Sequence, residues 1–111
     1  MACPLRKLGV HTICRLEDIL PNCGVCALVQ GEQVALFRID DKIFAIGNRD
    51  PFSGANVLSR GIVGDLNGEL VVASPVYKQH FSLLTGRCLE DPSVSVPVYR
   101  ARLEGADIQI L

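Results

Sequence analysis

Short apolar runs alternate with turn-forming residues along the whole chain, roughly every eight to twelve residues. Most runs are β-branched and alternate apolar with polar positions, which favours strands that bury one face. The expected strands are Thr12–Cys14, Gly24–Val29, Gln33–Ile39, Lys42–Ile46, Ile62–Asp65, Glu69–Ala73, His80–Ser82, Val96–Leu103 and Ala106–Leu111. Helix is expected only at Leu16–Leu20, where Pro21 ends it after about one turn. The sequence therefore predicts an all-β fold.

The connections between these runs are short and local. The clearest is Asn67-Gly68, because both residue types tolerate the positive φ angles of a tight two-residue hairpin. This turn places Val63 opposite Val72. Similar turns are expected at Gly31-Glu32, Asp40-Asp41 and Glu104-Gly105. Local connections favour antiparallel pairing, so we expect a β sandwich or barrel.

Composition and charge narrow the classes of function. The 111 residues are enough for one domain, expected to span 1–111, and 49% hydrophobic against 21% charged residues argues against disorder. The apolar runs are far too short to cross a bilayer, so no membrane association is expected. A net charge of -1 without a Lys/Arg stripe argues against nucleic-acid binding. Because the start of the sequence carries no secretion signal, we expect a cytoplasmic protein.

The five cysteines and two histidines are the candidates for redox chemistry or metal binding. Cys23-x-x-Cys26 has the spacing of a redox dithiol, but such motifs lie at a helix N-terminus, whereas this pair opens an expected strand. We interpret both as structural thiols and keep a dithiol function as a hypothesis. His80 is interpreted as a half-exposed strand residue. No ligand set for zinc is apparent.

Two proline-containing loops are expected to carry function, because loops on a rigid β scaffold commonly do. They run from Asn48 to Ala55 and from Ser74 to Gln79. Residues 45–55 resemble the first cluster-binding loop of Rieske domains, and residues 74–81, followed by the turn Thr85-Gly86, resemble the second. Those loops hold a two-iron two-sulfur cluster with Cys-x-His and Cys-x-x-His. The resemblance implies a Rieske-type antiparallel β sandwich or barrel with a small inserted former cluster-binding subdomain, at about residues 47–87.

On this resemblance, the cysteine and histidine positions are Asp50 and Phe52 in the first loop, and Ser74 and Tyr77 in the second. None of these side chains replaces the thiolate or imidazole ligands of such a cluster. We therefore expect no cofactor and no metal in this chain. The alternative that stays open is a Rieske-type ferredoxin, an electron carrier with unconventional cluster ligands.

Within the Rieske family, the chain resembles the small subunits of cytoplasmic NAD(P)H-dependent nitrite reductases. The segments that carry this resemblance are 16–21, 24–28, 32–35, 50–52, 57–61, 68–70, 72–75, 78–79 and 88–91. The resemblance implies a partner, the large catalytic subunit, which carries FAD, an iron–sulfur cluster and siroheme. That subunit reduces nitrite to ammonium with NAD(P)H during nitrate assimilation. We therefore expect a non-catalytic interaction subunit, with no catalytic residue in this chain.

Several side chains of the loop region are candidates for docking to that partner. Tyr77 is interpreted as filling the volume of the missing cluster, whereas Phe52 fits either filling or anchoring a partner. The Lys and Arg side chains of this region could instead form a solvated surface of mixed charge together with Glu90 and Asp91, without binding a partner. The docking candidates are Arg49, Phe52, Arg60, Lys78 and Arg87.

Overall fold

The computed structural model describes residues 11–110. They form ten strands and two short 3-10 helices, η1 and η2. In chain order, the elements are β1 (His11–Arg15), η1 (Leu16–Asp18), β2 (Cys23–Val29), β3 (Glu32–Ile39), β4 (Lys42–Gly47), η2 (Leu58–Arg60), β5 (Ile62–Leu66), β6 (Glu69–Ala73), β7 (His80–Ser82), β8 (Val98–Tyr99), β9 (Ala101–Glu104) and β10 (Asp107–Ile110). No helix in this part of the chain is long and apolar enough to span a membrane.

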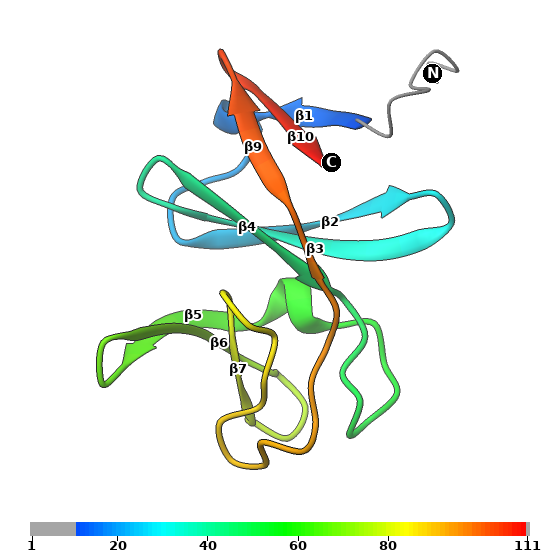
Figure 1. Cartoon of the computed structure of the whole chain (residues 1–111), viewed down its shortest axis with the longest axis vertical. Coiled ribbons are helices and arrows are strands. Elements are labelled where there is room, and N and C mark those ends of the chain that lie inside the picture. Colours follow the sequence, from blue (N-terminus) through cyan, green and yellow to red (C-terminus); the bar gives the residue numbers. More distant parts are fainter. Residues whose placement is uncertain (1–10, 111) are drawn as a thin grey trace.

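The strands form three antiparallel sheets stacked along the long axis of the molecule (Figure 1). Their strand orders are β1-β10-β9, β2-β3-β4-β8 and β5-β6-β7. The last sheet is inserted in the sequence between β4 and β8, which pair with each other through Ala45–Tyr99 and Ile46–Val98. This is the arrangement expected for a small subdomain inserted into a β sandwich.

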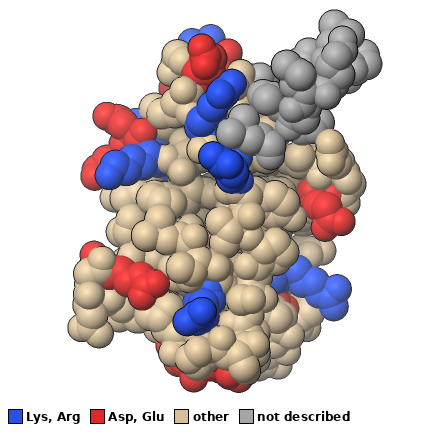
Figure 2. Space-filling model, viewed as in Figure 1, with Lys and Arg blue, Asp and Glu red and all other residues tan. Residues whose placement is uncertain are grey.

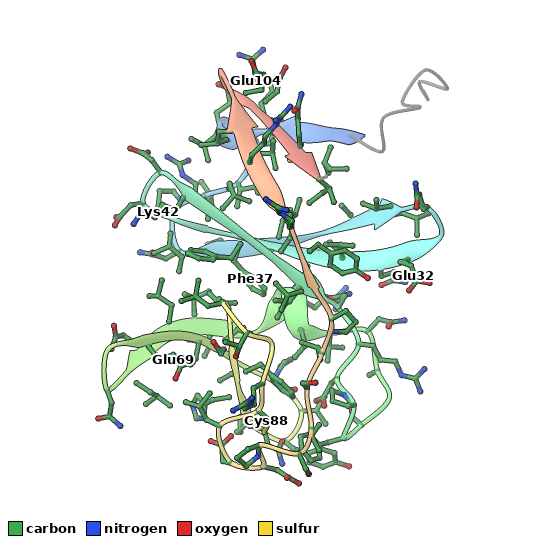
Figure 3. The ribbon with its side chains drawn as sticks, viewed as in Figure 1. Glu32, Phe37, Lys42, Glu69, Cys88 and Glu104 are labelled. Carbon is green, nitrogen blue, oxygen red and sulfur yellow. The ribbon has the colours of Figure 1, made fainter. Side chains whose placement is uncertain are left out.

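β3 divides the hydrophobic core into two parts because its successive side chains point to opposite faces. Ala35 and Phe37 pack toward β5–β7, in a cluster that includes Leu58, Val72 and Phe81. Val34 and Leu36 pack toward the other side, against residues of β10 and of the segment after η1. All four side chains of β3 are fully buried. Figure 3 shows Phe37 between the middle and lower sheets.

The two ends of the described chain lie together. His11 of β1 pairs with Ile110 of β10, in the sheet farthest from the loops that connect β4 to β5 and β6 to β7 (Figure 1). The loops therefore occupy the opposite end of the molecule from the point where the chain enters and leaves the domain.

Most sequence predictions of strands are confirmed, and the bounds of β6 and β7 agree fully. The Asn67-Gly68 turn has φ angles of 54° and 87° and pairs Val63 with Val72 as predicted. The single strand expected at Val96–Leu103 was wrong in extent: it is divided at Arg100 into β8 and β9, which belong to different sheets. The helical turn is shorter than expected, and η2 was not predicted.

Candidate functional site

The loop that follows β4 is held closed by Asp50. The Asp50 backbone N–H donates to Ala55 O at 2.8 Å, and the Gly54 N–H donates to Asp50 O at 2.7 Å. The Phe52 N–H donates to Asp50 Oδ1 at 2.8 Å. Gly54 has a φ of 77°, which favours glycine. We call residues 50–55 the Asp50 loop.

Residues 74–79, the Ser74 loop, repeat this pattern at the same offsets. The Ser74 N–H donates to Gln79 O at 2.9 Å, and the Lys78 N–H donates to Ser74 O at 3.0 Å. The Val76 N–H donates to Ser74 Oγ at 3.3 Å. Proline follows the first residue in both loops, and the fifth residue, here Lys78, again has a positive φ, 68°.

A third loop, residues 82–87, has the same design; the sequence indicated a turn at Thr85-Gly86 but not its likeness to the other two loops. The Ser82 N–H donates to Arg87 O at 2.9 Å, and the Gly86 N–H donates to Ser82 O at 2.8 Å. The Leu84 N–H donates to Ser82 Oγ at 3.2 Å, and Gly86 has a φ of 76°. A serine four residues before a glycine is the signal in the sequence that this loop shares with the Ser74 loop's first residue and the Asp50 loop's glycine. We call it the Ser82 loop.

The Asp50 and Ser74 loops are joined through their first residues. Ser74 Oγ donates to Asp50 Oδ2 at 2.5 Å, and both residues are fully buried. Together with the Phe52 N–H, this bond gives each carboxylate oxygen of Asp50 a donor. A buried carboxylate requires such compensation, and a bond to a charged acceptor is stronger than a neutral one. Two residues at predicted cysteine-ligand positions therefore connect the two loops directly.

These residues do not fit a two-iron two-sulfur cluster. Asp50 and Ser74 are in direct contact, at the place where two cysteine sulfurs would have to stand apart to hold an iron. Phe52 has no donor atom, and Tyr77 offers a phenol in place of an imidazole. Within residues 11–110, no group of three or more His, Cys, Asp or Glu side chains could hold a metal ion.

The aromatic residues at the predicted histidine positions lie at the surface. Tyr77 is 58% exposed, so the expectation that it fills the volume of the missing cluster was wrong. Phe52 is 36% exposed and packs one side of its ring against the buried Phe81, with 6.2 Å between the ring centroids. Phe52 therefore covers part of the core and presents an apolar face to solvent, and its role as a partner anchor stays a prediction.

The four candidate cations are all exposed but do not all lie on the joined loops. Arg49 directly precedes the Asp50 loop, Lys78 lies in the Ser74 loop, and Arg87 ends the Ser82 loop. Arg60 lies on η2, which packs against β2 and β3. Within residues 11–110, none of the four forms an ion pair. Their charges are therefore available to a partner.

His80 and Glu90 fix the segment that follows the Ser82 loop. Glu90 Oε1 accepts from the His80 backbone N–H at 2.8 Å, and Glu90 Oε2 lies 2.6 Å from His80 Nδ1. Desolvation acts to raise the pKa of Glu90, but the hydrogen bonds and charge of His80 outweigh it and lower that pKa below its usual value. His80 is half-buried on β7, as the sequence indicated, and its partner Glu90 was not predicted.

Asn48, which the sequence did not single out, ties the Asp50 loop to the sheet. It is 2% exposed, its Oδ1 accepts from the Ser59 N–H at 2.7 Å, and its Nδ2 donates to Gln33 Oε1 at 3.1 Å. It borders an open cleft of about 610 Å³ beside the loop. Other residues lining the cleft include Arg49, Pro51, Asn56, Pro97 and Tyr99.

The Cys23/Cys26 pair does not have the setting of a redox dithiol. Both residues lie on β2, as predicted, and are free and exposed. Three residues apart on a strand, their side chains point to opposite faces. Cys26 Sγ instead accepts a hydrogen bond from Asn48 Nδ2 at 3.4 Å.

Residues 10–111 match the family model of the Rieske-like [2Fe-2S] domain. The nitrite reductase (NADH) small subunit of Salmonella typhimurium is 53% identical over 102 residues, covering 90% of this chain and 94% of the relative. The NMR structure of the Escherichia coli protein NirD superposes with a TM-score of 0.83 at 48% identity, over 91% of this chain and 96% of NirD.

A third relative is much longer. The nitrite reductase [NAD(P)H] large subunit of Klebsiella oxytoca is 39% identical over 100 residues, which are 90% of this chain but 10% of that protein. A region similar to this chain is thus part of a large-subunit polypeptide. This chain belongs to the Rieske-like family and, within it, to the small subunits of NADH-dependent nitrite reductases.

Proposed function

We propose that this small subunit carries no electrons itself and binds the large catalytic subunit of nitrite reductase through its loop end, the end formed by the Asp50 and Ser74 loops. The observation that carries this proposal is the buried hydrogen bond between Asp50 and Ser74. It holds both loops together at the place where the family binds a cluster. The loop architecture is therefore kept without the residues needed for electron transfer.

The relative from Klebsiella oxytoca supports the choice of partner. A region similar to this chain lies within its large-subunit polypeptide, so the two parts there share one chain. Linking two modules raises their effective concentration toward each other. In this chain β1 and β10 meet at the end opposite the loops, so a polypeptide link from there leaves the loop end free to dock.

The exposed side chains of the loop end suit a protein partner. Phe52 and Tyr77 present apolar surface, and aromatic residues are favoured at the centre of interfaces. Arg49 and Lys78 flank them without an acidic partner within residues 11–110. We include both pairs in the proposed docking surface, with Arg87 at its margin; Arg60, on η2, lies outside the loops.

The cofactors of the reaction belong, in this proposal, to the large subunit. The resemblance implies FAD, an iron–sulfur cluster and siroheme there, with NAD(P)H as the electron donor for reduction of nitrite to ammonium in the cytoplasm. The small subunit then contributes binding surface and supports assembly or activity of the complex. The region at about residues 47–87 serves docking within a single domain, 1–111.

The experiment is to mix the purified large subunit with wild-type chain, with Phe52→Asp and with Leu20→Asp, and to measure binding and NADH-dependent nitrite reduction. Leu20 is a matched control because it is 71% exposed and lies beside η1, away from the loops. We expect Phe52→Asp to abolish binding and stimulation of activity, and Leu20→Asp to retain both. Full activity of the large subunit without this chain would contradict a required role.

A further inference from the structure

We propose that Lys78 is the central electrostatic contact of the docking surface, and that the Ser74 loop binds an acidic patch with apolar surroundings on the large subunit. This inference rests on the proposed function and names the chemistry of the surface that the loop recognises. It follows from the backbone conformation of Lys78, from the absence of an ion pair to its ammonium group within residues 11–110, and from the apolar side chains beside it.

The backbone of Lys78 is in a conformation that favours glycine. The fifth residue has a φ of 77° in the Asp50 loop, 68° in the Ser74 loop and 76° in the Ser82 loop. Gly54 and Gly86 fill this position in two loops, because a Cβ is disfavoured at positive φ. Lys78 adopts the same conformation at a cost in stability. Strained residues of this kind cluster where function requires a particular side chain.

The charge of Lys78 is not used within the described residues. The side chain is exposed, and its Nζ donates one hydrogen bond, at 3.3 Å, to the Pro75 carbonyl oxygen of the same loop. No carboxylate within residues 11–110 pairs with it. An exposed bond within one turn contributes little, since water competes for both groups. The ammonium group is therefore free to meet a carboxylate of a partner.

The neighbours of Lys78 specify the rest of the partner surface. Tyr77 is 58% exposed and Val76 is 42% exposed, and Phe52 adds a third apolar group from the joined Asp50 loop. These three apolar side chains, next to the Lys78 ammonium group, are complementary to an apolar surface that carries carboxylates. A nucleic acid would need a broader basic surface, whereas the face in Figure 2 shows small, separate groups of both charges.

The test uses the full chain and the purified large subunit, with Lys78→Gly, Lys78→Glu and the control Lys42→Glu. Lys42→Glu makes the same charge change at an exposed position, the first residue of β4, outside the Asp50, Ser74 and Ser82 loops. We expect Lys78→Gly to raise the midpoint of thermal unfolding by about 4 °C, because strain is relieved. It should weaken binding to the large subunit about fivefold, as one exposed ion pair is lost.

Lys78→Glu should weaken binding more than about tenfold through repulsion, and Lys42→Glu should leave it within about twofold of wild type. Added salt should weaken the wild type more than Lys78→Gly. Unchanged affinity of both Lys78 variants would overturn this inference and leave the proposed function intact. Unfolding of Lys78→Gly at a lower temperature than wild type would also overturn it, by assigning Lys78 a structural role. Absence of binding by the wild type itself would overturn the proposed function.

Discussion

The hydroxyl of Ser74 donates a hydrogen bond of 2.5 Å to the carboxylate of Asp50, and neither residue is exposed to solvent. The two residues belong to different loops, 24 positions apart in the sequence. In a cluster-binding relative, the iron connects the corresponding loops through cysteine ligands. Here a side-chain hydrogen bond connects the two loops directly.

Replacement of Ser74 by alanine should destabilise the protein by about 2 kcal/mol, because a buried carboxylate oxygen loses its donor. Ser82→Ala is the matched control, since Ser82 is also fully buried and its Oγ accepts only backbone N–H groups. Ser82→Ala should lower the free energy of unfolding by about 1 kcal/mol. Urea unfolding of both variants measures the difference. Equal losses would show that the bond between the loops contributes nothing beyond the local turn.

The glycines of the Asp50 and Ser82 loops should respond differently to alanine. Gly54→Ala should cost about 1 kcal/mol, because φ is positive but the space is open apart from the end of Arg49. Gly86→Ala should cost about 3 kcal/mol or more, since the added Cβ also collides with the Val96 carbonyl oxygen. Thermal or urea unfolding of the two variants checks the order, and the reverse order would contradict the loop geometry.

Asn48 should prove more important for stability than any exposed residue of the same loop region. Asn48→Ala leaves the Ser59 N–H and Gln33 Oε1 without that partner, at a cost of about 2 kcal/mol. Asn56→Ala, at an exposed position that lines the same cleft, should change stability by less than about 0.5 kcal/mol. The free energy of unfolding of each variant is the measurement. A similar small effect for both would contradict the role of Asn48 as a link between loop and sheet.

The His80–Glu90 pair should make a small contribution that depends on pH. Because folding lowers the pKa of Glu90, its contribution is present above the ordinary value of 4.5 and is lost as the pH falls through the lowered value. The pair is partly exposed, so the effect should stay below about 1 kcal/mol. The difference in the free energy of unfolding between wild type and Glu90→Gln, measured with urea from pH 6 to pH 3, should shrink toward zero. A difference that grows as the pH falls would contradict a lowered pKa of Glu90 in the folded protein.

Local sequence signals predicted the strands and most turns well. The β5–β6 hairpin is determined by Asn67-Gly68 and by the alternation on either side, all within about ten residues. η2 lacked such a signal, because Val57 at its N-cap makes no side-chain hydrogen bond to the helix. The break at Arg100 was also hidden: β8 pairs with β4, and β9 pairs with β10. Contacts distant in sequence decide which sheet each part joins.

The sequence predicted two irregular loops where the structure has them, but not the contacts between them. The alignment of Asp50 and Ser74 with cysteine positions stays a prediction, and sequence alone cannot show that their side chains bond to each other. The exposure of Tyr77 was missed, because an aromatic residue at a lost ligand position suggests filling of space.

Docking without a cluster is tested most directly by the affinity of this chain for the purified large subunit, measured by calorimetry before and after anaerobic reconstitution with iron and sulfide. The chain as purified should contain no stoichiometric iron or acid-labile sulfide and should bind. Reconstitution should change neither its iron content nor the affinity. Stoichiometric uptake of a cluster, with binding that appears only afterwards, would contradict a loop end held together by Asp50 and Ser74 alone.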